Sequence, residues 1–281
     1  MNINYEIISV YDMLTKLNIL KKKYVPGKIS YWNEAFEKKN RTVEFAYRGI
    51  SNKEYKLRPR VLNETICDVS QDNFRIPLLS FKREASSYLR NICGNDELLW
   101  MLYAQHYGVP TRLLDFSSNP LVAMYFACQN THTDGALWVI NIDTYEYEKV
   151  MEYIHLHDLD GWSQEEYMNV VLNSNDDEII APIYFLPEYI DTRMNAQSSR
   201  FMLWPNKRFD LEDIIGNDYM SFDPPQNNDY YYEYAMKLII PKSCKNDILR
   251  ELDLLGINEK NLFPGLASIG KYINFLHSKI D

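Results

Sequence analysis

The segment HYGVPTRLLDFSSNP, residues 106–120, concentrates side chains that can bind anions or transfer protons. Its first residue, His106, could hydrogen-bond a bound ligand or act as a general base. Because His106 follows a predicted helix, it could equally cap the C-terminus of that helix, where a donor side chain interacts with unsatisfied carbonyl groups. The residue pattern leaves both roles open, and Tyr107 then leads into a turn.

Two pairs of polar residues in the same segment favour structural roles. Arg112 and Asp115 lie three residues apart, and we expect them to pair with each other and lock a loop before the next helix. Ser117 and Ser118, followed by an Asn-Pro pair, are typical of a helix N-terminus with a capping side-chain oxygen and an early proline. A helix N-terminus is also an anion-binding site, so a ligand phosphate is compatible with the same serines.

Arg48 and Gly49 form a second group of chemical interest. A strand over Thr42–Tyr47 is predicted to deliver them at its end. The planar guanidinium of Arg48 suits a phosphate group, and Gly49 permits a close backbone approach. The alternative is a structural pair between Arg48 and a carboxylate at the strand end.

The spacing of apolar residues and the positions of glycine and proline predict the helices and strands that position these residues. Apolar spacing predicts a helix over Ser9–Leu20 and two helices within Ile76–Tyr107, broken near Gly94. Further strands are predicted from Ala136, in the segments IIAPIYF and RMNAQSSRFMLW, and in YEYAMKLIIP before Pro241; a helix then ends at Gly256. Arg193 and Gln197 are expected to share a strand face, and residues 216–232 are the clearest loop. With no linker or repeat, one α+β domain with flanking helices is the simplest architecture.

Composition limits the classes of function. The formal charge of −9 and pI near 5.2 disfavour broad binding to a polyanion, although a local basic groove is compatible with them. The four cysteines are far apart and form no metal-ligand cluster, so no metal site is expected. No signal peptide or membrane-spanning run is present in the sequence, which predicts a cytoplasmic protein without membrane association.

Several motifs together resemble the FRG domain family. They are YRG at residues 47–49, HYGVPTRLLDFSSNPLVAMYFA from His106, RMNAQSSRF from Arg193, and KLIIP with the later LLGI and LFPGL, a likeness spanning about Arg48 to Leu266. The resemblance implies a bacterial or phage protein with an FRG domain over residues 41–281 and an N-terminal helical extension over residues 1–40.

The same motifs are more distantly similar to ADP-ribosyltransferases of the Arg-Ser-Glu type. This likeness implies a split antiparallel sheet, with NAD as the substrate held by the Arg-Gly strand and the serine-rich segment. The residues expected to contact NAD are Tyr47, Arg48, Gly49, Tyr107, Thr111, Arg112, Ser117, Ser118 and Gln197. His106 and Glu233 are the expected catalytic residues. Glu233 is chosen because Lys237 occupies the usual position of the catalytic glutamate, and Glu233 precedes it by four residues on the same strand.

Two functions are compatible with this resemblance. The first is an NAD-consuming transferase, a toxin or antiphage effector that modifies a nucleic acid or protein and has a regulatory or antitoxin partner. The second is a non-catalytic module of the same fold that binds a nucleotide, an RNA end or a protein. A carboxylate facing Arg48 and Ser117 across one cleft would favour the enzyme.

Overall fold

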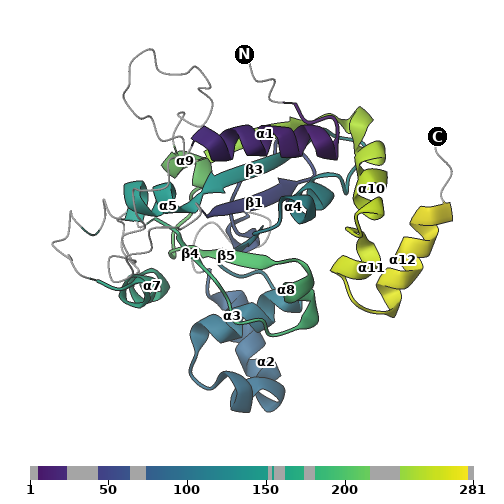
Figure 1. The fold of residues 1–281 in the computed structure, drawn as a ribbon. Coiled ribbons are helices and arrows are strands. Elements are labelled where there is room, and N and C mark those ends of the chain that lie inside the picture. The colour runs from purple at the N-terminus through teal and green to yellow at the C-terminus, as the bar shows by residue number, and fades with distance from the viewer. Residues whose placement is uncertain are drawn as a thin grey trace, which may run out of the picture.

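Six antiparallel strands form one sheet flanked by helices, so the α+β class predicted from the sequence is confirmed (Figure 1). The computed structural model describes residues 6–23, 44–63, 74–150, 154, 162–173, 181–215 and 235–277. The strands are β1 (Phe45–Ile50), β2 (Leu113–Ser117), β3 (Gly135–Asn141), β4 (Ile183–Phe185), β5 (Ser199–Leu203) and β6 (Ala235–Ile240). Their order across the sheet is β4-β5-β2-β1-β3-β6.

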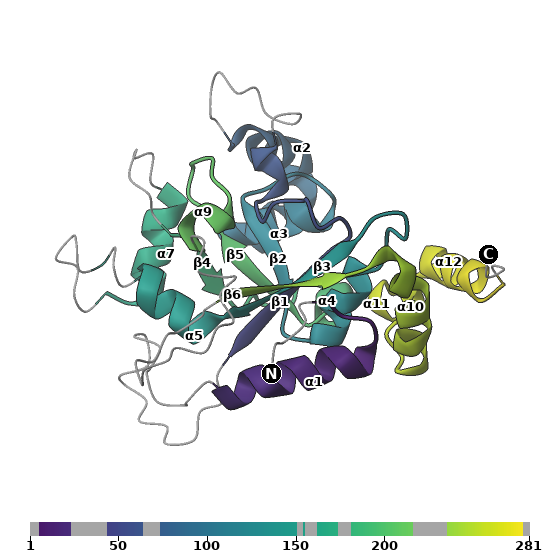
Figure 2. The same cartoon turned by 90° about the horizontal axis from the view of Figure 1, so that it is seen from above.

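Helices lie on both sides of this sheet and beyond its edges (Figures 1 and 2). They are α1 (Val10–Lys23), α2 (Ile76–Cys93), α3 (Glu97–His106), α4 (Pro120–Ala127), α5 (Ile142–Tyr145), α7 (Gln164–Asn173), α8 (Thr192–Ala196), α9 (Leu211–Ile215), α10 (Lys245–Leu254), α11 (Glu259–Leu262) and α12 (Leu266–His277). Short η2 (Arg60–Leu62), η3 (Glu146–Val150) and η5 (Lys242–Cys244) complete the helical elements. Within the described part of the chain, none of the helices has the length and apolar character needed to cross a membrane.

The hydrophobic core forms on the two faces of the sheet. On one face, Tyr47, Val139 and Met236 stand opposite one another across β1, β3 and β6 and are buried with residues of α1, α4 and α10. On the other face, Trp138 is fully buried with residues of η2, α5 and α9. A third cluster packs α2, α3 and α7 against β4 and β5. In Figure 2, α2 and α3 lie at the opposite end of the molecule from α1.

Several predicted elements are confirmed and three details are wrong. The helices over 9–20 and within 76–107, and the strands at 136 and before Pro241, are present as α1, α2, α3, β3 and β6. However, β1 extends to Ile50 because it pairs with β3 along its whole length, so Arg48 lies inside the strand rather than at its end. Residues Leu113–Ser117 form a central strand instead of a loop.

The third correction concerns the segment RMNAQSSRF. Its first residues form α8, because the side chain of Asp191 accepts a hydrogen bond from Met194 N at 2.7 Å and so caps a short helix. Arg193 and Gln197 are therefore one helical turn apart and do not share a strand face. The predicted loop over residues 216–232 lies outside the described residues.

Candidate functional site

A pocket of about 600 Å³ opens where β1 and β2 separate. The two strands share a single pair in register, Tyr47 opposite Ser117, whereas β1 and β3 share six. The pocket is lined by Arg48, Ile50, Glu54, Tyr55, Lys56, Arg58, Arg60, Asn63, Gln105, Gly108, Val109, Pro110, Leu113, Leu114 and Asp115. The separation of two neighbouring strands thus exposes their facing edges to a cavity.

Side chains satisfy the main-chain groups that β2 presents toward β1. The Arg48 Nη1 group donates to the carbonyl oxygen of Asp115, and Gln105 Nε2 donates to that of Leu113 at 3.3 Å. The amide of Leu113 donates to Thr111 Oγ1 at 3.1 Å. Because an unpaired buried main-chain group is costly, these bonds stabilise the separated arrangement of the two strands. Contacts within the chain therefore hold the two strands apart at the pocket.

Gln105 connects the pocket residues to one another. Its Nε2 group also donates to Asp115 Oδ2 at 2.9 Å, and its Oε1 atom accepts a hydrogen bond from Thr111 Oγ1. Arg48 and Thr111, both expected from the sequence to contact the ligand, are thus joined through Gln105 and Asp115. Sequence reasoning missed Gln105 because its position, one residue before His106 on an apolar helix, gives no separate signal.

Arg48 keeps hydrogen-bonding capacity for a ligand. Its Nε atom is buried and has no hydrogen-bond partner among the described residues. Burial lowers the pKa of Arg48, while the nearby charge of Asp115 raises it. An arginine nevertheless remains protonated at neutral pH. The guanidinium is therefore a partly desolvated cation beside a cavity, where an incoming anion would interact with it strongly.

The lining of the pocket is more basic than the chain as a whole. Its formal charge is +2, whereas that of the chain is −9. The charged lining residues are four cations, Arg48, Lys56, Arg58 and Arg60, and two carboxylates, Glu54 and Asp115. Tyr55 adds an aromatic side chain that is 57% exposed. The sequence signal for this basic lining is the segment KEYKLRPR, residues 53–60, which the motif analysis did not single out.

Contacts to distant elements hold that basic segment in place. Lys53 forms an ion pair with Asp134 at 3.1 Å, and Arg58 forms one with Asp210 at 3.4 Å. The amide of Leu57 donates to the Glu212 carboxylate of α9, and burial raises the pKa of that carboxyl. This wall of the pocket is consequently anchored to both β3 and α9.

Tyr47 and Gly49 face away from Arg48, toward α4. Tyr47 is 2% exposed within the core, and burial raises the pKa of its phenol to about 12. A Cβ atom on Gly49 would lie 1.7 Å from the carbonyl oxygen of Ala123. Gly49 does permit a close backbone approach, as predicted, but the approaching backbone belongs to α4. Strand alternation thus separates Arg48 from its two neighbours in the YRG motif.

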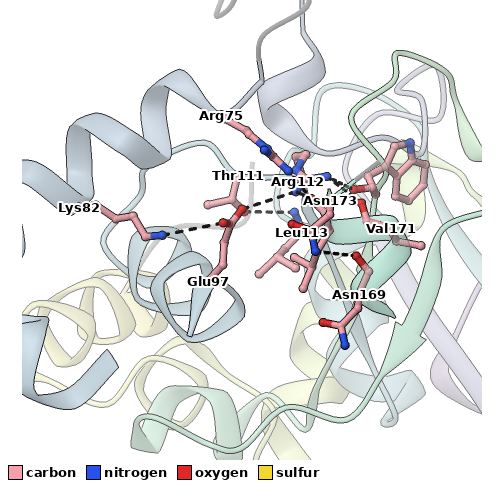
Figure 3. A network of polar contacts seen from close by, with 11 residues as sticks. Arg75, Lys82, Glu97, Thr111, Arg112, Leu113, Asn169, Val171 and Asn173 are labelled. Carbon is pink, nitrogen blue, oxygen red and sulfur yellow. Dashed lines mark hydrogen bonds and ion pairs between the residues drawn. The ribbon is translucent and has the colours of Figure 1, made fainter. Parts of the chain in front are cut away.

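The predicted pairing of Arg112 with Asp115 is wrong. Arg112 is a buried structural residue, and Figure 3 shows its contacts. Its guanidinium donates to the carbonyl oxygens of Val171, Trp204 and Leu172 at 3.0–3.2 Å and lies 3.8 Å from Glu97. The side chain is 2% exposed, and burial lowers its pKa to about 10. Asp115 instead contacts Gln105, because successive side chains of a strand alternate between its faces.

The serines and Gln197 connect β2 with the segment after α8. Ser117 is 5% exposed; its Oγ atom donates to the carbonyl oxygen of Gln197 at 2.7 Å and accepts from Asn119 N at 3.0 Å. Asn119, rather than a serine, caps α4, with proline at the first helical position as predicted. Ser118 Oγ lies 3.5 Å from the carbonyl oxygen of Ser198, and Gln197 Nε2 donates to that of Leu262. None of these four side chains lines the pocket.

His106 and Tyr107 also lie outside the pocket lining. His106 Nδ1 pairs with Asp191 Oδ2, which links the end of α3 to the start of α8. Tyr107 is 66% exposed, and its ring lies against that of His106 with 4.9 Å between the centroids. We expected from the sequence that Tyr47, Arg48, His106, Thr111 and Ser117 would meet at one cleft, but of these five only Arg48 lines the pocket, and Thr111 is linked to it indirectly through Gln105.

Lys237, at the position expected for a catalytic glutamate, lies on the same face of the sheet as Arg48. Arg48 stands opposite Trp138 on β3, which stands opposite Lys237 on β6, and directly opposed residues share a face of the sheet. Lys237 Nζ donates to the carbonyl oxygen of Lys53 at 2.6 Å and lies 5.4 Å from the centre of the Trp138 ring. Glu233 lies outside the described residues.

Comparison with known families identifies the segment that contains the pocket. Residues 43–135 match the family model of the FRG domain, which confirms the resemblance inferred from the sequence motifs. This segment is therefore similar to the FRG domain, and every residue lining the pocket lies within it. No curated protein and no solved structure matches the chain. The extension of the domain over residues 41–281 stays a prediction.

Proposed function

We propose that the pocket between β1 and β2 binds a nucleotide, with NAD as its ligand. The observation that carries this proposal is Arg48, a cation at the cavity whose Nε donor has no partner among the described residues. A guanidinium binds phosphate oxygens through charge-assisted hydrogen bonds, and the basic surroundings add long-range attraction.

The other lining residues fit the remaining parts of a nucleotide. The exposed ring of Tyr55 offers a surface on which a base can stack. Asn63 contributes an amide whose Nδ2 group can donate a hydrogen bond, while its Oδ1 atom accepts one from Arg58 Nε at 3.1 Å. A volume of about 600 Å³ is within the usual range for small-molecule sites.

Calorimetric titration of the full chain with NAD tests this proposal. Arg48→Ala should weaken binding at least about tenfold, since a charge-assisted hydrogen bond contributes roughly 1.5–3 kcal/mol. Arg48→Lys should recover part of the affinity, because an ammonium keeps the charge without the planar fork. The control is Arg90→Ala, an exposed residue of α2 outside the pocket lining, which should leave affinity unchanged.

Thermal melting of the same variants separates ligand binding from a structural role. Arg48 also caps the carbonyl oxygen of Asp115, so some loss of stability is expected from Arg48→Ala. A melting temperature lowered by many degrees, with NAD affinity retained, would show that the arginine serves the fold and would overturn the proposal.

A transferase reaction is the second candidate function. It rests on the resemblance to transferases and on the row Arg48, Trp138 and Lys237, which places the strand expected to carry the catalytic glutamate on the same face of the sheet as Arg48. Lys237 itself supplies no carboxylate, so the acid of such a reaction would have to come from another residue. In such a reaction the nicotinamide–ribose bond breaks, nicotinamide leaves, and ADP-ribose joins a nucleophile of a nucleic acid or protein acceptor. A toxin or antiphage role with an antitoxin partner would follow from that activity.

Release of nicotinamide from labelled NAD, in the presence of cellular RNA and protein, tests the second candidate. Release that requires Arg48 and yields an ADP-ribosylated product would support a transferase. NAD binding without release or product would leave the non-catalytic binding module as the function.

A further inference from the structure

The residue whose carbonyl oxygen binds Arg48 also carries a carboxylate. Arg48 donates to the carbonyl oxygen of Asp115, and the carboxylate of the same residue also lines the pocket. The electrostatic influence of Asp115 on Arg48 agrees with this proximity. If a ligand phosphate binds Arg48, the group next to that phosphate would lie near the carboxylate of Asp115.

We propose that Asp115 recognises the ribose hydroxyls of the ligand, so that the pocket selects ribonucleotides over deoxynucleotides. This inference rests on the nucleotide-binding function proposed above. An ionised carboxylate only accepts hydrogen bonds, so it repels phosphate and suits the hydroxyls of the neighbouring sugar. Dinucleotide-binding folds use an acidic residue for the same contact.

Asp115 is held in position for this role. Gln105 Nε2 donates to Asp115 Oδ2 at 2.9 Å, and Gln105 is in turn fixed by Thr111, a residue that is 2% exposed. A carboxylate with a restricted orientation loses less conformational entropy when it binds a ligand. Gln105 is thus the positioning residue for Asp115.

Glu54, the other carboxylate of the lining, is less suited to the contact. It belongs to the exposed part of the 53–60 segment, and among the described residues its carboxylate has no hydrogen bond that would orient it. Glu54→Gln is consequently a matched control for Asp115→Asn, because each variant neutralises one carboxylate of the same pocket.

Titration of the full chain with ADP, 2′-deoxy-ADP, 3′-deoxy-ADP and inorganic pyrophosphate tests the assignment. The wild-type chain should bind ADP at least about tenfold more tightly than one or both deoxy analogues, as expected for a lost hydrogen bond to a charged group. In Asp115→Asn this preference should fall to about twofold or less, while pyrophosphate binds as well or better. Glu54→Gln should keep the preference.

The outcomes distinguish this inference from the function on which it rests. Equal affinity of the wild-type chain for ADP and both deoxy analogues, with ADP binding still dependent on Arg48, would overturn the role of Asp115 and leave nucleotide binding intact. A preference unchanged in Asp115→Asn, or lost in Glu54→Gln, would also overturn it. Absence of ADP binding to a chain that binds NAD would contradict the assignment, and failure of both ligands to bind would contradict both proposals.

Discussion

At the scale of single residues, the two arginines of the motif region have opposite roles. Arg48 keeps an unpartnered donor at the pocket, within the limits of the described residues, whereas Arg112 uses its guanidinium on three carbonyl oxygens of the core. A sequence pattern does not separate these cases, because each arginine stands beside a predominantly apolar segment, in FAYRGI and in VPTRLL. The difference is decided by the hydrogen-bond partners of each side chain, and those of Arg112 are Val171, Leu172 and Trp204, far along the chain.

Arg112→Ala is expected to destabilise the fold by about 3 kcal/mol or more, because it removes a donor from three buried or part-buried carbonyl oxygens and the nearer of the two cations beside Glu97, the other being Lys82 at 4.0 Å. Urea unfolding followed by tryptophan fluorescence measures this loss. Arg112→Lys should recover only a minor part, since one ammonium cannot reproduce the planar fork. A variant as stable as the wild type would disprove the structural role.

At the scale of elements, close contact between α4 and β1 sets the position of the YRG strand. The carbonyl oxygen of Ala123 and the amide of Ala127 approach Gly49 so closely that no side chain fits between the two backbones. The apolar helix after the serines therefore supports the strand that carries Arg48. The uncharged helix that follows the polar segment thus packs against the back of the pocket strand.

Gly49→Ala should destabilise the protein by roughly 1–3 kcal/mol or more, because the new methyl group forces α4 away from β1. Gly270→Ala is the matched control: it lies in α12, where a Cβ meets no atom within 4 Å, and alanine favours a helix by up to about 1 kcal/mol. Denaturant melts of both variants give the comparison. Equal stability of the two would refute the close-packing account.

At the scale of the whole molecule, local patterns predict the helices and the buried strands better than the site. α1, α3 and β3 were recognisable because their apolar periodicity is continuous. β2 was not, because Asp115 and Ser117 interrupt its apolar residues and its main-chain partners come from β5, far along the chain. The pocket could not be predicted, since it depends on where β1 and β2 stop pairing and on the 53–60 segment folding against α9.

The most direct test of a nucleotide pocket at the β1–β2 separation is the Nε–Hε resonance of Arg48. In a chain labelled with ¹⁵N-arginine, and with the signal assigned by its absence from Arg48→Lys, titration with NAD should shift this resonance saturably. The signal of buried Arg112 should stay nearly constant, because its guanidinium is already occupied by carbonyl oxygens. If NAD shifts no arginine signal, or only signals from arginines outside the pocket lining, the account of Arg48 as the nucleotide-binding residue is contradicted.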